Sequence, residues 1–228
     1  MMLIYHRLLT AYGPQGWWPG DSRFEMIAGA ILTQAAAWRN VEHALANLRR
    51  EAISDWHILH RTDSEILAQI IRPSGYYNVK ARKLKAFASH VCEQYGGDLD
   101  AMFASDTVNL RRELLSIYGI GPETADDILV YAAGKPSFVI DAYTIRIMER
   151  IGITPEGGSD YAGWQALFHA SVVPDVAVYN EFHALLDHHH KAACTRNDPQ
   201  CNGCCLNEIC ATGLRRKHEG QLTPNPSA

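Results

Sequence analysis

The chain has 228 residues, of which 47% are hydrophobic and 20% charged, a composition typical of a globular protein with a sizeable buried core. It carries 21 Lys and Arg against 25 Asp and Glu, and this net charge of −4 weakens, without excluding, a polyanionic partner. No apolar run reaches the roughly 18 to 20 residues of a membrane span, and the first thirteen residues lack a signal-peptide pattern. We therefore expect a cytoplasmic protein without membrane association.

Apolar residues recur with helical spacing through most of the chain. Such stripes run through residues 24–34 and 84–92, and further helices are predicted over residues 39–49, 63–70, 107–117, 123–133, 142–151, 160–172 and 175–190. Ser105 or Asp106, and Asp141, stand where two of these helices need an N-cap. No convincing period-2 strand pattern is present. The sequence therefore predicts an all-α fold.

Two short basic clusters could follow a phosphate backbone despite the negative net charge. One consists of Lys80, Arg82, Lys83 and Lys85, and the other of residues 215–217. Each cluster taken alone is more typical of a solvated helix face than of a nucleic-acid contact.

Residues 114–134 have the pattern of two apolar helices joined by the turn Gly119-Ile120-Gly121. Glycines permit a left-handed backbone and close approach by another molecule, and the N–H groups that open the second helix could bind a phosphate. A plain helical hairpin has the same pattern, and the turn alone does not decide between the two. Asp141, twenty residues after Gly121, is by position either a helix N-cap or a catalytic base.

Four cysteines lie close together near the end of the chain: Cys194, Cys201, Cys204 and Cys210. A disulfide framework is not expected without a secretory signal, whereas four thiolates suit a structural zinc ion or a 4Fe-4S cluster. Zinc ribbons usually have two separated C-x2-C pairs and this segment has one, so the spacing favours iron–sulfur. We interpret Cys205 as a spare thiol, His188–His190 as surface or capping residues, and His183 as a packed side chain.

The Gly-x-Gly hairpin, the aspartate that heads the next helix and the C-x6-C-x2-C-x5-C spacing together resemble the endonuclease III family of helix–hairpin–helix DNA glycosylases. The resemblance covers roughly residues 20–212. It implies a two-lobed all-α fold: a six-helix barrel in residues 21–134 and an iron–sulfur cluster lobe in residues 1–20 and 135–212. The polar composition at the end of the chain predicts a disordered tail in residues 213–228. The resemblance also implies a 4Fe-4S cluster on the four cysteines, and a monomer that acts on double-stranded DNA with a damaged base.

The resemblance assigns DNA contacts to several positions. Gln34, at the end of "AILTQ", matches the glutamine that fills the space left by an extruded base. Tyr76, in "GYYNVKA", stands where an apolar residue wedges the opposite strand. Gly119, Ile120 and Gly121 match the hairpin that holds a phosphate.

Catalytic assignments follow from the same resemblance. Asp141 matches the aspartate that activates or orients water and stabilises positive charge on the sugar. Bifunctional members carry a Schiff-base lysine two residues after the second hairpin glycine, where this chain has Glu123. Because glutamate cannot form an imine, we expect a monofunctional glycosylase in which Glu123 supports the water or simply occupies the space.

Hydrolysis by water favours a good leaving group, such as an N-alkylated purine, whose flat cationic ring suits aromatic surfaces. The "WWP" segment and the aromatic residue four positions after Gln34 resemble 3-methyladenine glycosylases, which implies that Trp18, Pro19 and Trp38 line the base pocket. The alternative is that these aromatics pack between lobes. Two other functions stay open: a bifunctional glycosylase and abasic-site lyase for oxidised pyrimidines that uses another lysine, and a catalytically weak DNA-binding iron–sulfur protein.

Overall fold

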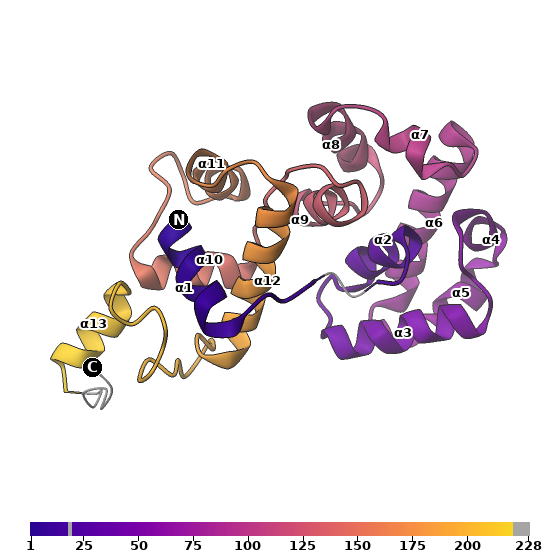
Figure 1. Cartoon of the computed structure of the whole chain (residues 1–228). Helices are drawn as coiled ribbons and strands as arrows, with labels where there is room; N and C mark the ends of the chain where they lie inside the picture. The colour runs from indigo at the N-terminus through magenta and orange to yellow at the C-terminus, as the bar shows by residue number, and fades with distance from the viewer. Residues whose placement is uncertain (18–19, 221–228) are drawn as a thin grey trace. The chain divides into compact units, whose positions relative to one another are not determined.

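The computed structural model describes residues 1–17 and 20–220, and every regular element in these ranges is helical. The chain forms two compact units, shown in Figure 1. The central unit comprises Trp18–Lys135, and the terminal unit combines Met1–Trp17 with Pro136–Ala228. None of the helices in the described ranges has both the length and the apolar character needed to cross a bilayer.

The central unit contains most of the short helices. In chain order they are α2 (Arg23–Leu32), α3 (Trp38–Arg50), α4 (Trp56–Arg61), α5 (Ser64–Ile70), the 3₁₀ turn η1 (Arg72–Ser74), α6 (Tyr77–Tyr95), α7 (Leu99–Phe103), α8 (Thr107–Ser116), α9 (Pro122–Asp127) and the π-helical segment η2 (Ile128–Ala132). Helix α6 is the longest of them and contacts α2, α4, α5 and α7. It therefore forms the centre around which the shorter helices pack.

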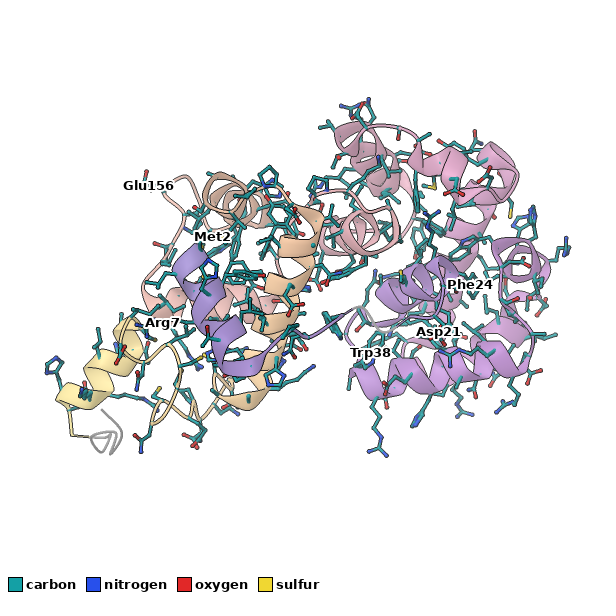
Figure 2. The ribbon with its side chains drawn as sticks, in the orientation of Figure 1. Met2, Arg7, Asp21, Phe24, Trp38 and Glu156 are labelled. Carbon is teal, nitrogen blue, oxygen red and sulfur yellow. The ribbon has the colours of Figure 1, made fainter. Side chains whose placement is uncertain are left out.

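Aromatic packing and side-chain caps hold these helices in place. The ring of Trp56 lies against Phe24 of α2 and Phe87 of α6, with centroids 4.7 Å apart in both pairs. Figure 2 labels Phe24 on α2. Helix α8 begins at Asp106, whose carboxylate accepts a hydrogen bond from the main-chain N–H of Asn109 at 2.9 Å. The N-cap expected at Ser105 or Asp106 is thus Asp106.

The terminal unit is assembled from both ends of the sequence. It contains α1 (Met2–Tyr12), α10 (Ala142–Ile151), α11 (Tyr161–Ser171), α12 (Val176–Ala192) and α13 (Ala211–His218). Helices α1 and α10 both pack on α12, and α13 packs on α10 (Figure 1). Phe138 stacks on Phe168 with centroids 4.0 Å apart, and both rings contact Phe182 of α12. Helix α12 is therefore the central helix of this unit, against which α1, α10 and the two stacked rings pack.

One expectation about the C-terminal segment is wrong. Residues 213–218, assigned to a disordered tail, form most of α13. This polar helix is held because the guanidinium of Arg216 donates to the carbonyl of Pro199 at 3.0 Å, and because Gly213 lies against Asn207, where an added Cβ would be 2.9 Å from the carbonyl oxygen. Residues 221–228 lie outside the described residues.

Candidate functional site

Helices α8 and α9 form the hairpin of the central unit. Gly119 has φ 86°, and a Cβ placed there would lie 2.3 Å from Cγ of Lys83, so both the backbone and the neighbouring side chain require glycine. Ile120 is buried, and its N–H bonds the carbonyl of Ile117 at 3.1 Å. Gly121 opens α9 with φ −92°, and a Cβ there would meet nothing within 4 Å. The protein itself thus constrains the first glycine, whereas the second is bordered by open space.

The hairpin is held by an ion pair whose carboxylate is buried. Arg111 of α8 binds Asp126 of α9 through two parallel hydrogen bonds, Nε to Oδ1 at 2.8 Å and Nη2 to Oδ2 at 2.9 Å. The side chain of Asp126 is 0% exposed. Glu123, in the first turn of α9, lies on the exposed surface of the same helix. Of the three acidic residues of this helix, Asp126 holds the hairpin together, Asp127 is also buried, and Glu123 faces outward.

Gln34 lies directly against the hairpin. Its Nε2 donates to the carbonyl oxygen of Gly119 at 3.0 Å and to Oγ1 of Thr124 at 2.9 Å, and its Oε1 accepts a hydrogen bond from Nζ of Lys83. Two motifs assigned to DNA contact from separate parts of the sequence therefore meet in one place.

Tyr76 precedes α6 on a strained backbone. Its side chain is 71% exposed, and its φ of 45° is uncommon for a residue with a Cβ. Gly75 before it has φ 68°, so the chain turns sharply just where the ring leaves the surface. Both observations suit a side chain that is presented to a partner.

The lysines of α6 mostly donate hydrogen bonds to other groups of the protein. Lys80 is buried and donates to the carbonyls of Leu32 and Ser74, at 2.7 and 2.6 Å. Lys85 donates to the carbonyl of Thr62 at 2.7 Å, among others. The idea that this cluster follows a phosphate backbone is therefore wrong for Lys80.

In the terminal unit, Asp141 is both an N-cap and a partner of a buried histidine. Its Oδ1 accepts a hydrogen bond from the N–H of Thr144 at 2.6 Å, and its Oδ2 lies 3.2 Å from Nε2 of His183 on α12. Burial raises the pKa of Asp141, but the hydrogen bonds and the charge of His183 outweigh it and hold the pKa below its ordinary value. The aspartate is thus a carboxylate at neutral pH, and His183 does more than fill space.

A basic cavity of about 570 Å³ begins at the residue after Asp141. The residues that line it are Ala142, Tyr143, Arg146, His190, Lys191, Thr195 and Arg196. Tyr143 stacks on His190 with centroids 3.6 Å apart, and the guanidinium of Arg146 lies 5.4 Å from the centre of the Tyr143 ring. Sequence reasoning missed this cavity because its three cationic residues come from α10, α12 and the loop after α12. Cations and a stacked ring around one hollow suit a phosphate or a base.

The four cysteines line a second cavity of the terminal unit. Cys194, Cys201, Cys204 and Cys210 all border it, whereas Cys205 does not and borders another cavity beside Arg7. Among the described residues, no three His, Cys, Asp or Glu side chains converge as a single metal ion would require. The arrangement is one of four thiols spread around a common space.

Several N–H groups point at these sulfur atoms. Nη1 of Arg150 lies 3.2 Å from Sγ of Cys194, and Nη1 of Arg216 and Nε2 of His189 lie 3.9 Å from the sulfurs of Cys201 and Cys204 respectively. Donors of this kind stabilise thiolates and cluster sulfurs.

His189 corrects the expectation for the histidine run. It is buried, its Nδ1 lies 2.8 Å from the hydroxyl of Tyr12, and its ring borders the cysteine cavity. Burial lowers the pKa of His189, but its bonds to the thiols of Cys194 and Cys204 raise it to about 9. The three histidines do diverge, as expected for consecutive helical residues, but the middle one faces inward.

Of the aromatic residues assigned to the base pocket, the described part of the chain contains one. Trp38 opens α3, as labelled in Figure 2, packs partly against the core of the central unit, and donates from Nε1 to Oε1 of Glu42 at 3.0 Å. Trp18 and Pro19 lie outside the described residues. Trp17, just before them, has its ring 5.8 Å from that of His183.

Residues 28–162 match the family described as "HhH-GPD superfamily base excision DNA repair protein". The chain is also 42% identical over 208 residues to a Methanocaldococcus jannaschii protein provisionally named a DNA repair glycosylase, with 91% of this chain and 94% of that protein aligned. The chain belongs to the HhH-GPD superfamily. It is accordingly a base-excision DNA repair glycosylase, and the predicted family is confirmed.

Three further proteins resemble the chain along most of its length. An Aeropyrum pernix thymine-DNA glycosylase is 30% identical, with 91% of this chain and 92% of that protein covered. A structure of H. pylori 3-methyladenine DNA glycosylase bound to 1,N6-ethenoadenine is 27% identical, with a TM-score of 0.68 and coverage of 83% and 94%. An endonuclease III–DNA complex is 20% identical, with a TM-score of 0.80 and coverage of 95% and 96%, which confirms the predicted all-α fold.

Proposed function

We propose that this HhH-GPD protein is a monofunctional DNA N-glycosylase that removes alkylated purines such as 3-methyladenine from double-stranded DNA. The observation that carries the proposal is that the chain has Asp141 as a largely buried carboxylate held by His183, and has Glu123 at the hairpin position where a lyase would need lysine. The likeness to a 3-methyladenine glycosylase adds support for the substrate class.

Extrusion of the base falls to the central unit. The main chain of Gly119, Ile120 and Gly121 holds a phosphate, and the open space beside Gly121 leaves room for it. Gln34 fills the vacated position in the stack, and the exposed ring of Tyr76 enters the opposite strand. Trp38, with Trp18 and Pro19, surrounds the flipped base.

Asp141 supplies the chemistry of the hydrolysis. As the bond between the purine nitrogen and C1′ breaks, its electron pair leaves with the base and positive charge develops on the sugar. The carboxylate of Asp141 stabilises that charge and takes a proton from the water whose oxygen bonds to C1′. A cationic alkylated purine leaves readily, so no covalent intermediate is needed. Glu123 supports the water or occupies the place of the lysine.

The cysteine cavity fits a 4Fe-4S cluster. Four thiols border one space, which suits the four thiolate ligands of such a cluster. Burial raises the pKa of Cys201 and Cys210, so these thiols release protons when a metal binds. Cys194, Cys201, Cys204 and Cys210 would hold the cluster, whose contribution would be to stabilise the terminal unit.

A panel of duplexes that each contain one modified base tests the function. We expect release of 3-methyladenine or ethenoadenine, with strand breaks only after alkali, and no adduct when abasic-site DNA is treated with enzyme and borohydride. Thymine and uracil belong in the panel because the chain also resembles a thymine-DNA glycosylase and a thymine/uracil-DNA glycosylase. Excision of those bases alone would replace the alkylpurine assignment.

A borohydride adduct would instead establish a lyase. Lys83, whose ammonium lies at Gln34 beside the hairpin, is then the lysine to examine, because Lys80 is buried and bonded to two carbonyls. An adduct that Lys83→Ala abolishes would identify Lys83 as the nucleophile.

A further inference from the structure

One buried ammonium group, that of Lys80, binds both segments that carry the side chains proposed to enter the DNA, Gln34 and Tyr76. Lys80, in the first turn of α6, is 2% exposed. Its Nζ donates to the carbonyl oxygen of Leu32 at 2.7 Å and to that of Ser74 at 2.6 Å. Leu32 is the last residue of α2, two positions before Gln34, and Ser74 is the last residue of η1, two positions before Tyr76.

Both acceptors are carbonyls that a helix end leaves without an intrahelical partner. A cation at the C-terminal end of α2 is favoured by the dipole of that helix, and at both carbonyls a charged donor makes a stronger bond than a neutral one. Burial lowers the pKa of Lys80 to about 8, which leaves the side chain mostly charged at neutral pH. The lysine therefore ties the end of α2 to the end of η1 through main-chain atoms.

We propose that Lys80 is a positioning residue that fixes the spacing between Gln34 and Tyr76, so that these two side chains enter the duplex together. This inference rests on the roles proposed for those two residues. The left-handed backbone of Tyr76 begins two residues after the carbonyl of Ser74 that Lys80 binds. Without Lys80, each segment would still exist, but their separation would vary.

Lys85 offers a matched control on the same helix. It also donates to main-chain carbonyls, those of Leu59, His60 and Thr62 at the end of α4, but that loop carries neither probing residue. Lys80→Met and Lys85→Met each remove an ammonium that binds helix-end carbonyls. Both are expected to lower stability, and only Lys80→Met is expected to disturb DNA probing.

The test uses a duplex with a tetrahydrofuran abasic analogue and 2-aminopurine in the opposite strand, so that neither catalysis nor the natural lesion is needed. Fluorescence anisotropy first establishes the protein concentration that saturates the duplex. At that concentration, the wild-type chain is expected to raise 2-aminopurine emission. Lys80→Met should reduce that rise at least fivefold, and Lys85→Met should keep it within twofold. A full rise with folded Lys80→Met overturns the role of Lys80 alone. No rise with the wild-type chain would remove the probing function itself.

A second measurement does not require Lys80→Met to fold. Gln34→Ala, Tyr76→Ala and the double variant are compared in the otherwise native chain. If Gln34 and Tyr76 act together, the fraction of the emission rise that the double variant retains should exceed the product of the fractions that the two single variants retain. Independent, multiplicative losses would contradict the proposal.

Discussion

Nε2 of His183 lies 3.2 Å from Oδ2 of Asp141, so α12 places an imidazole against the carboxylate that heads α10. His183→Leu removes this partner, and the pKa of Asp141 should rise because burial then acts with less opposition. The active form is the deprotonated carboxylate, so the acidic limb of the kcat profile should move to higher pH. Single-turnover excision measured across pH checks this.

His183→Gln keeps a donor without a charge, and so separates the hydrogen bond from the electrostatic effect. His169→Leu is the matched control, because His169 is in the same unit but accepts its bond from the N–H of Phe138 at 3.0 Å. An unshifted acidic limb in His183→Leu would show that the histidine serves packing only.

Asp141→Asn keeps a cap for α10 while removing the charge. We expect excision to fall by about 10²-fold or more, because the amide can neither accept a proton nor stabilise a cationic sugar. Affinity for undamaged duplex should change less than threefold. Excision at the parental rate would show that another group supplies the carboxylate function.

Two adjacent cysteines allow a sharp test of the cluster. Cys204 borders the cysteine cavity and Cys205 does not. The native protein is expected to be brown with stoichiometric iron, and Cys204→Ser should lose iron and visible absorption, whereas Cys205→Ser should keep both. A colourless protein containing one zinc ion would establish the other metal.

The two hairpin glycines should respond differently to alanine. Gly119→Ala combines a left-handed backbone with a collision against Lys83 and should cost about 1–2 kcal/mol or more of folding stability. Gly121→Ala meets nothing in the protein, so its stability should change by less than about 0.5 kcal/mol. Its DNA affinity should nevertheless fall, because the added methyl occupies the space left for a phosphate. Native affinity in Gly121→Ala would place the DNA contact elsewhere.

Neighbouring arginines on α8 differ in what they hold. Arg111→Met removes the cation bound to the buried carboxylate of Asp126 and should cost about 3–5 kcal/mol in chemical denaturation. Arg112→Met loses an exposed bond to Asn109 and should change stability by less than about 0.5 kcal/mol. Similar losses in the two variants would argue against a special role for the buried pair.

Most of the longer helices were predictable because their apolar stripes are long enough to show a period, whereas α1 (Met2–Tyr12) was not predicted. Helices α4 and α7 are too short for one, and α13 is polar on most sides and is held by contacts around Arg216. The position of α13 depends on its contacts with the cysteine loop, and the local sequence pattern of α13 does not indicate those contacts.

The geometry of the candidate site was predictable where a residue type has few uses. The turn glycines lie between α8 and α9, and the four closely spaced cysteines border one cavity. The roles of His183 and His189 could not be predicted, because they depend on which side of α12 faces α10 and α1. Lys80 was misread for a similar reason: a run of basic residues does not reveal which member points inward. Tertiary packing decides such cases.

The terminal unit contains residues from both ends of the chain, and this sets an order for its assembly. Tyr12 and its partner His189 are separated by 177 positions, and the whole central unit lies between them. At typical rates of synthesis, α1 waits on the order of 10–35 s before α12 has been made. The central unit is complete within that interval and can fold first. The residues that line the cysteine cavity, from Ile147 to Thr212, are therefore made after the central unit, so the proposed cluster would be inserted late in the maturation of the protein.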